Sequence, residues 1–281
     1  MSPGMLAHVT GLARQCTSLA QGSDYEAGEE GDDYSSVENN LPDAVLALRA
    51  HMPQDTSLGD RLLEQALRVA KLDVKRAATV LSNLERFRRE QDWALPLTLP
   101  TAATSACLRS GMHVILPPDR EARPVLLYRA SKLDPTQHSI EEYQRMGSYL
   151  MECITREQPE VQHRGVTLLV DLRDASLRVA TSFSLADLQR GIGMWRDTFP
   201  AKLKRLIVVN APLYLHGIVK TCLLMLRKKM RARVHVLKSQ AHLAGFLEPR
   251  AVPIDLGGEL PASYWSNWCD EHEKRFVVVG I

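Results

Sequence analysis

The chain opens with a segment that has no hydrophobic periodicity. Residues 1–40 show no regular spacing of apolar positions, and the stretch 21–40 is rich in Gly, Ser and acidic residues. Such a composition buries little apolar surface and is typical of a flexible segment. We therefore expect an acidic, flexible leader and predict that order begins near Pro42.

Apolar residues recur at helical spacing over residues 42–92. The spacing predicts a helix over Arg61–Leu72 and a second helix capped by Asp73, a residue type favoured at helix starts. The expected apolar faces consist of Leu63, Leu67 and Ala70, and of Val74, Ala77, Ala78, Leu81 and Leu84. Proline residues break the pattern beyond Trp93, so we expect a small all-helical unit over residues 41–96.

From residue 101 the pattern alternates between short apolar runs and longer helical stretches. Strands are predicted at His113–Leu116, Pro124–Ala130, Val166–Leu172, Arg205–Asn210 and Arg233–Leu237, and helices over 101–110, 139–157, 184–197 and 212–230. The run from Val166 to Val170 is apolar at nearly every position, which suits a strand buried on both faces. Residues 101–281 are therefore predicted to form an α/β domain, with a mostly parallel five-stranded sheet covered by helices.

The stretch Leu213–Leu226 is apolar on nearly all sides, interrupted only by His216, Lys220 and Thr221. A surface helix needs one apolar stripe, so this segment requires apolar contacts on two sides. One interpretation is a helix buried in the core. The other is a lid that covers an apolar cavity with one face and meets a membrane with the other.

Charge favours the second interpretation. Residues 227–233 carry five cations in seven positions directly after the apolar stretch, and Lys202, Lys204 and Arg205 form a second basic group. The net charge is +2, but residues 21–40 contain seven acids and no Lys or Arg, so the remainder carries +9. An apolar surface edged with cations suits an anionic membrane. Nucleic acid is the competing polyanion; no reading motif is present and aromatic residues make up only 6%.

Other features of the sequence indicate the cellular compartment of the protein. The five cysteines lie far apart and form no CxxC pair, which indicates reduced thiols. The first twenty residues make a poor secretory signal, and Leu213–Leu226 is shorter than the roughly 20 residues that a membrane span requires. We expect a soluble cytoplasmic protein that associates peripherally with membranes.

Signatures of catalysis are missing. The sequence has no GxSxG elbow, no GxxxxGK[ST] loop and no HExxH pair, and Gly191 and Gly193 do not follow a predicted strand. Glu271, His272 and Glu273 are expected at a solvated helix end. We therefore predict a protein without catalytic residues, metal or cofactor.

Several blocks, in order, resemble the CRAL-TRIO lipid-transfer family, which includes the tocopherol and retinaldehyde carriers. The resemblance spans residues 58–280. It rests on Leu67-Arg68 with Leu72–Ala77, Arg123-Pro124-Val125, Gly165–Asp171, Phe199–Leu203, Val209–Pro212, Arg233-Val234-His235 and Leu256–Pro261. The block from Phe199 to Lys238 is most similar to the lipid-binding domain of a non-receptor tyrosine phosphatase, although the phosphatase domain is absent here.

The resemblance implies a bowl whose sheet is the floor and whose gate helix closes over a lipid. It implies pocket-lining positions at Ser148, Tyr149, Val170, Met194, Trp195, Phe199, Leu203 and Leu206, and gate positions at Leu215, Val219 and Leu223. It implies phosphoinositide-binding cations at Lys202, Lys204, Lys229 and Arg233.

Two departures from the family pattern affect these expectations. Ala70 stands where the tocopherol carrier has a further anion-binding Arg. Leu223-Leu224 replaces Lys-Pro in the gate helix, which therefore lacks a proline kink.

Two functions follow from this sequence. The first is a carrier or sensor that binds a hydrophobic molecule or lipid and exchanges it at membranes, with a basic rim on anionic phospholipid or phosphoinositide headgroups and no nucleic-acid partner. The alternative is a non-catalytic interaction module with the same fold and a filled pocket.

Overall fold

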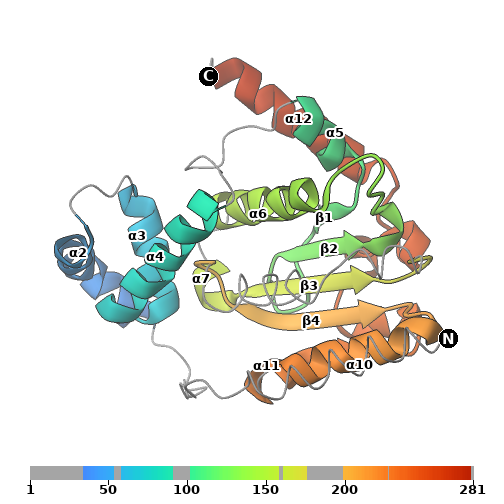
Figure 1. Ribbon diagram of the computed structural model, residues 1–281, viewed down its shortest axis with the longest axis horizontal. Coiled ribbons are helices and arrows are strands. Elements are labelled where there is room, and N and C mark those ends of the chain that lie inside the picture. The colour runs from blue at the N-terminus through green and yellow to red at the C-terminus, as the bar shows by residue number, and fades with distance from the viewer. Residues whose placement is uncertain are drawn as a thin grey trace.

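The computed structural model describes residues 34–53, 58–90, 102–157, 161–175, 199–226 and 228–279. The first two ranges form a helical unit that lies to one side of the sheet (Figure 1). Its helices are α2 (Tyr34–His51), α3 (Asp60–Ala70) and α4 (Val74–Glu90). As predicted, Leu63, Leu67 and Leu81 are fully buried between them. Asp73 accepts a hydrogen bond from the backbone N–H of Arg76 at 3.0 Å, which confirms the predicted cap of α4.

The predicted start of order at Pro42 is wrong. Helix α2 begins at Tyr34 and contains Pro42 in its interior. Glu38 holds this first part of the helix, because both of its carboxylate oxygens accept hydrogen bonds from the Arg68 guanidinium, at 2.8 and 3.1 Å. Leu41 is buried next to it. A contact with a residue far along the chain thus orders a segment whose own composition is poor in apolar residues. Residues 1–33 lie outside the described part of the chain, so the predicted leader is not tested.

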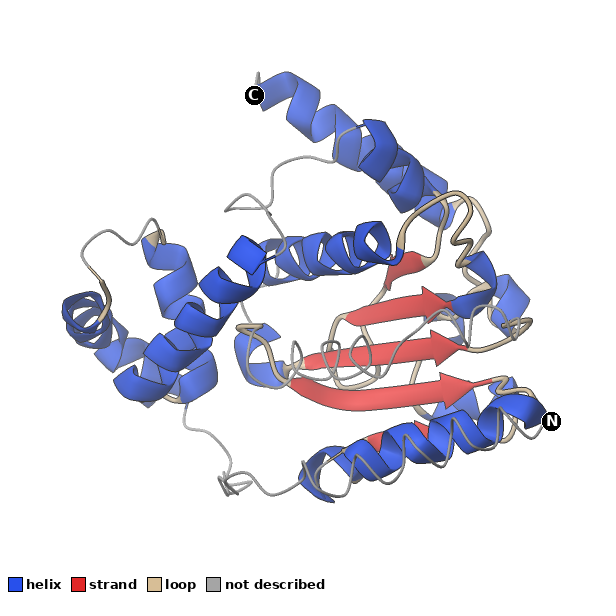
Figure 2. Cartoon of the chain, viewed as in Figure 1, coloured by secondary structure: helices blue, strands red, loops and turns tan. Residues whose placement is uncertain are grey.

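The second part of the chain forms one five-stranded sheet in the order β1-β2-β3-β4-β5 (Figure 2). β1 pairs antiparallel with β2, and the remaining pairs are parallel, which confirms the predicted mostly parallel sheet. The strands are β1 (His113–Leu116), β2 (Val125–Arg129), β3 (Val166–Asp171), β4 (Leu203–Val209) and β5 (Val234–Val236).

Helices and 3-10 turns surround the sheet (Figure 1). The helices are α5 (Ala102–Arg109), α6 (Ile140–Glu157), α7 (Val161–Arg164), α10 (His216–Met225), α11 (Lys228–Arg231) and α12 (Tyr264–Val279). The 3-10 turns are η1 (Ala130–Lys132), η3 (Leu213–Leu215), η4 (Gln240–Gly245), η5 (Pro249–Ala251) and η6 (Ile254–Leu256). The helix predicted over 184–197 lies outside the described residues. None of the described helices combines the length and the apolar character that crossing a bilayer requires.

The single helix predicted over 212–230 is wrong in detail. The segment starts as η3 after Pro212, continues as α10, and ends where Leu226 takes an extended conformation ahead of α11. α10 runs without interruption through Leu223-Leu224, as expected for a gate helix that lacks proline.

Candidate functional site

The two faces of the sheet differ in their burial. Side chains that pair in register point to the same side of a sheet, and alternate residues point to opposite sides. On one side, Leu127, Leu169 and Ile207 form a row with no solvent exposure. The C-terminal segment covers this side, because the rings of His235 and Phe246 lie 5.0 Å apart.

The opposite side is apolar, and five of its described side chains are only half-buried. Leu168, Leu206 and Val234 form one row, and Tyr128 and Val170 belong to the next. We call these five residues the floor. The structure thus brings the predicted pocket positions Val170 and Leu206 onto one face of adjacent strands.

Two helices approach the sheet on the side of the floor. His113 pairs with Tyr128, their rings lie 5.4 Å apart, and His113 packs against Gly147 of α6. A Cβ atom on Gly147 would lie 3.1 Å from His113 Nε2, so glycine permits this close approach. At the far end of the strands, Leu215 is buried with Ala130 and Ala175, and Tyr128 packs on that cluster. The floor therefore lies between α6 and the start of the gate segment.

The gate segment has an inner and an outer face. Leu215 is buried, and Val219 and Leu223, which follow at four-residue intervals, are half-buried. These three predicted gate positions share one side of the helix. On the other side Leu213 is 84% exposed and Leu224 is 56% exposed. Large exposed apolar side chains next to Lys220 are typical of a surface that binds another apolar phase.

Two predicted pocket positions on α6 have polar partners within the protein. Ser148 is buried, and its hydroxyl donates to the Gln144 carbonyl within the helix at 3.0 Å. The Tyr149 hydroxyl lies 2.6 Å from Nε2 of His272 on α12, with both residues buried. The expectation that His272 lies at a solvated helix end is wrong, because its ring is 3% exposed and stacks on Trp268. The roles of Ser148 and Tyr149 toward a ligand remain predictions.

The other predicted pocket positions fall in three places. Phe199 is buried in the main core and also borders a cavity against the helical unit. Leu203 is buried at the start of β4, next to a register irregularity between Val166 and Thr167. Met194 and Trp195 lie outside the described residues.

Three of the four predicted cations gather at the starting ends of β4 and β5. The Lys202 carbonyl accepts a hydrogen bond from the backbone N–H of Val166 at 2.8 Å, and Lys204 lies against Gly165. Arg233 donates from Nη1 to the Leu203 carbonyl at 2.7 Å. Lys229 is exposed on α11, which leads into β5. We call Lys202, Lys204, Lys229 and Arg233 the rim cations. Ala70 is buried in the helical unit, so no charge is supplied at that position.

Sequence reasoning missed two buried ionic arrangements. Arg88, which is 4% exposed, pairs with Glu152 of α6 and so connects the helical unit to the α/β domain. Leu81, Leu84 and Arg88 continue one stripe at helical spacing, and this signal could have identified Arg88 as buried. In the second arrangement, Asp119 accepts hydrogen bonds from the Thr167 hydroxyl at 2.7 Å and from Arg205 at 3.1 Å. Nothing in the local sequence indicates that Asp119 is buried.

Three of the described cysteines, Cys107, Cys153 and Cys269, are buried and have unreactive thiols. Burial raises the pKa of Cys107 to about 12 and that of Cys153 and Cys269 to about 11. These thiols therefore stay protonated at neutral pH, and the protonated thiol is a poor nucleophile. Within the described ranges, no three His, Cys, Asp or Glu side chains lie together as metal ligands. The absence of catalysis and of a cofactor remains a prediction.

Comparison with known proteins gives relatives over most of the chain. It is 29% identical over 227 residues to alpha-tocopherol transfer protein-like of Mus musculus, covering 79% of this chain and 66% of that protein. It is 27% identical over 151 residues to clavesin-1 of Rattus norvegicus, covering 53% of this chain and 42% of that protein. The chain thus spans just under two thirds of the length of the first relative and less than half of the second.

A solved structure has the same fold. The crystal structure of Sfh5 matches with a TM-score of 0.55 at 15% identity, covering 85% of this chain and 92% of that one. The family model for the CRAL/TRIO domain matches residues 108–258, which is more than half of the chain and includes the sheet, α6 and the gate segment. The chain belongs to the CRAL/TRIO domain family.

Proposed function

We propose that this protein carries a hydrophobic small molecule or lipid between the floor and the gate segment and exchanges it at membranes. The observation that carries the proposal is the asymmetry of the sheet. The central row of one face, Leu127, Leu169 and Ile207, is fully buried, whereas Leu168, Val170 and Leu206 on the other face are apolar and only half-buried. A named relative, alpha-tocopherol transfer protein-like, supports a lipid-like ligand. An apolar ligand on this face would remove about 25 cal/mol of unfavourable free energy for each Å² of apolar surface that it shields from water.

The gate segment supports exchange at a membrane. Its inner face, from Leu215 to Leu223, is directed toward the protein, and its outer face presents Leu213 and Leu224 to solvent. A helix of this kind exchanges one apolar environment for another when it swings from the protein onto a bilayer. The ligand then leaves without crossing water, where each CH₂ group would cost about 0.8 kcal/mol.

The rim cations support an anionic membrane surface, including phosphoinositide headgroups, as the docking partner. Lys229 is exposed on the same continuous segment as Leu224, and Lys202, Lys204 and Arg233 gather where β4 and β5 begin. Each cation near an anionic bilayer contributes about 1 kcal/mol to binding. The buried methyl group of Ala70 weakens the case for a phosphoinositide site of the tocopherol-carrier type.

Extraction of the purified protein with organic solvent, followed by mass spectrometry, tests the proposal. The wild-type protein should release a co-purified lipid. Val219→Asp places a charge on the inner face of the gate, where an unpaired charge against an apolar ligand is costly. We expect this variant to keep a normal circular dichroism spectrum and to lose the lipid.

Leu224→Asp is the matched control, because it introduces the same charge on the outer face of the same helix. It should retain the lipid and bind vesicles less well. Unfolding of Val219→Asp, or a wild-type protein that releases no lipid, would contradict the proposal and favour the interaction module with a filled pocket.

A further inference from the structure

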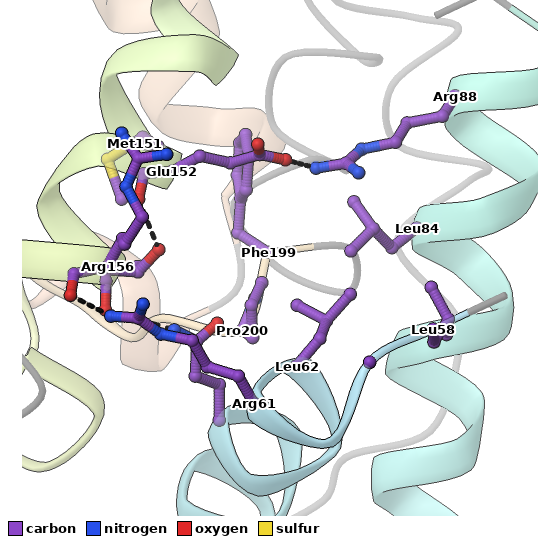
Figure 3. A pocket seen from close by; sticks show the side chains of 13 residues that line it. Leu58, Arg61, Leu62, Leu84, Arg88, Met151, Glu152, Arg156, Phe199 and Pro200 are labelled. Carbon is purple, nitrogen blue, oxygen red and sulfur yellow. Dashed lines mark hydrogen bonds and ion pairs between the residues drawn. The ribbon is translucent and has the colours of Figure 1, made fainter. Parts of the chain in front are cut away.

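A cavity of about 280 Å³ lies at the seam between the helical unit and the α/β domain (Figure 3). Helices α3 and α4 form one side of it, and α6 with Phe199 and Pro200 forms the other. We call it the seam cavity. The residues of the floor do not line it, so it is distinct from the site of the proposed function.

The middle of the seam cavity is apolar. Leu62 and Leu84 project from the helical unit, and Phe199 and Met151 face them from the α/β domain (Figure 3). Three of these four side chains are fixed by burial, because Met151 is 1%, Leu84 2% and Phe199 8% exposed. Rigid apolar walls of this kind accept a hydrocarbon chain without rearrangement.

The two ends of the seam cavity are charged. At one end the Arg88 guanidinium pairs with Glu152, and burial lowers the pKa of Arg88 to about 10 because the surroundings disfavour its charged form. At the other end Arg61 and Arg156 are exposed, and Arg61 donates to the Arg156 carbonyl, an acceptor without a full charge. Three guanidinium groups thus share the lining with one carboxylate. This excess of positive charge favours an anionic group in the cavity.

Size restricts the ligand further. Sites for drug-sized molecules usually measure about 300–1,000 Å³, so a cavity of about 280 Å³ suits a small ligand and is too small for a two-chain phospholipid. We propose that the seam cavity binds a single-chain carboxylate amphiphile. Its tail lies between Leu62, Leu84 and Phe199, and its carboxylate lies at the exposed end beside Arg61 and Arg156.

A ligand in the seam cavity would affect how the two units are held together. The ligand contacts the helical unit and the α/β domain at once, next to the Arg88–Glu152 ion pair that connects them. A ligand that binds only the assembled form stabilises that form by mass action. Occupancy of the seam cavity should therefore hold the two units together.

Titration calorimetry of the full chain with decanoate and with decanol tests the proposal. The two probes have the same chain length and differ in charge, so decanoate should bind more tightly by about tenfold, the effect of one charge-assisted hydrogen bond. Leu62→Trp fills the apolar middle and should weaken binding of both probes by at least about tenfold. Arg61→Gln changes an exposed side chain and should leave the fold intact. It should weaken the binding of decanoate by about tenfold and leave the binding of decanol unchanged.

Val170→Trp, on the floor, is the control for location and should leave unchanged the part of decanoate binding that Arg61→Gln weakens. If Val170→Trp removes decanoate binding and Leu62→Trp does not, the ligand binds at the floor. That result would overturn this proposal and leave the proposed function intact. Equal affinity for decanoate and decanol, no decanoate binding, or an unaltered Arg61→Gln variant would also overturn it.

Discussion

The outer face of the gate segment gives a quantitative prediction about membrane binding. Leu213 is 84% exposed and Leu224 is 56% exposed. Transfer of a whole leucine side chain from water to an apolar phase contributes about 2 kcal/mol. Weighted by the exposed fractions, the two leucines together contribute up to about 3 kcal/mol when the helix enters a bilayer, which is roughly a hundredfold in the partition constant.

The double variant Leu213→Ser/Leu224→Ser removes most of this contribution and keeps the charges of the segment. Its partitioning onto vesicles of phosphatidylcholine with phosphatidylserine, measured by co-sedimentation, should fall by up to about a hundredfold. Its stability against urea should be unchanged, because surface substitutions away from the core shift stability by about 0.5 kcal/mol or less.

Leu46→Ser provides the matched control. Leu46 is 67% exposed on α2 of the helical unit, away from the gate segment. This variant should partition like the wild-type protein. Equal losses for Leu46→Ser and the double variant would refute the assignment of the outer face to the membrane, as would a double variant that partitions normally.

Two further predictions concern the scaffold. Gly258→Ala should destabilise the fold by about 2 kcal/mol or more in urea denaturation, because the new Cβ would lie 2.1 Å from the Val252 carbonyl oxygen; Gly217→Ala, with no atom within 4 Å, should be neutral or stabilising. Burial lowers the pKa of His113 to about 4, so the unfolded chain takes up this proton at higher pH than the folded chain. Stability should thus be full above about pH 6.5 and fall by up to about 3 kcal/mol toward pH 4, and His113→Gln should lose that part of the pH dependence.

Periodicity in the sequence was sufficient for the strands of the sheet and for several of the helices. Leu63, Leu67 and Leu81 repeat at helical spacing and are buried, and the apolar run from Val166 lies between two parallel neighbours. These features are local: the side-chain direction of a helix or strand follows from its repeat, so the sequence alone reveals which face is apolar. The gate segment is different, because it is apolar on nearly all sides in the sequence and only the burial of Leu215 and the exposure of Leu213 and Leu224 distinguish its two faces.

Other features required contacts between distant residues. Glu38 orders the start of α2 through contacts with Arg68 and His163, and His272 is buried where α12 lies next to Tyr149. The seam cavity exists only where α3 and α4 meet α6, with Arg88 and Glu152 paired across it. No local sequence pattern predicts these contacts between distant residues, because burial and charge compensation depend on which elements pack together. The sequence by itself therefore determined the fold class, whereas tertiary packing decided which side of the gate is exposed, where charge is buried and where space remains for a ligand.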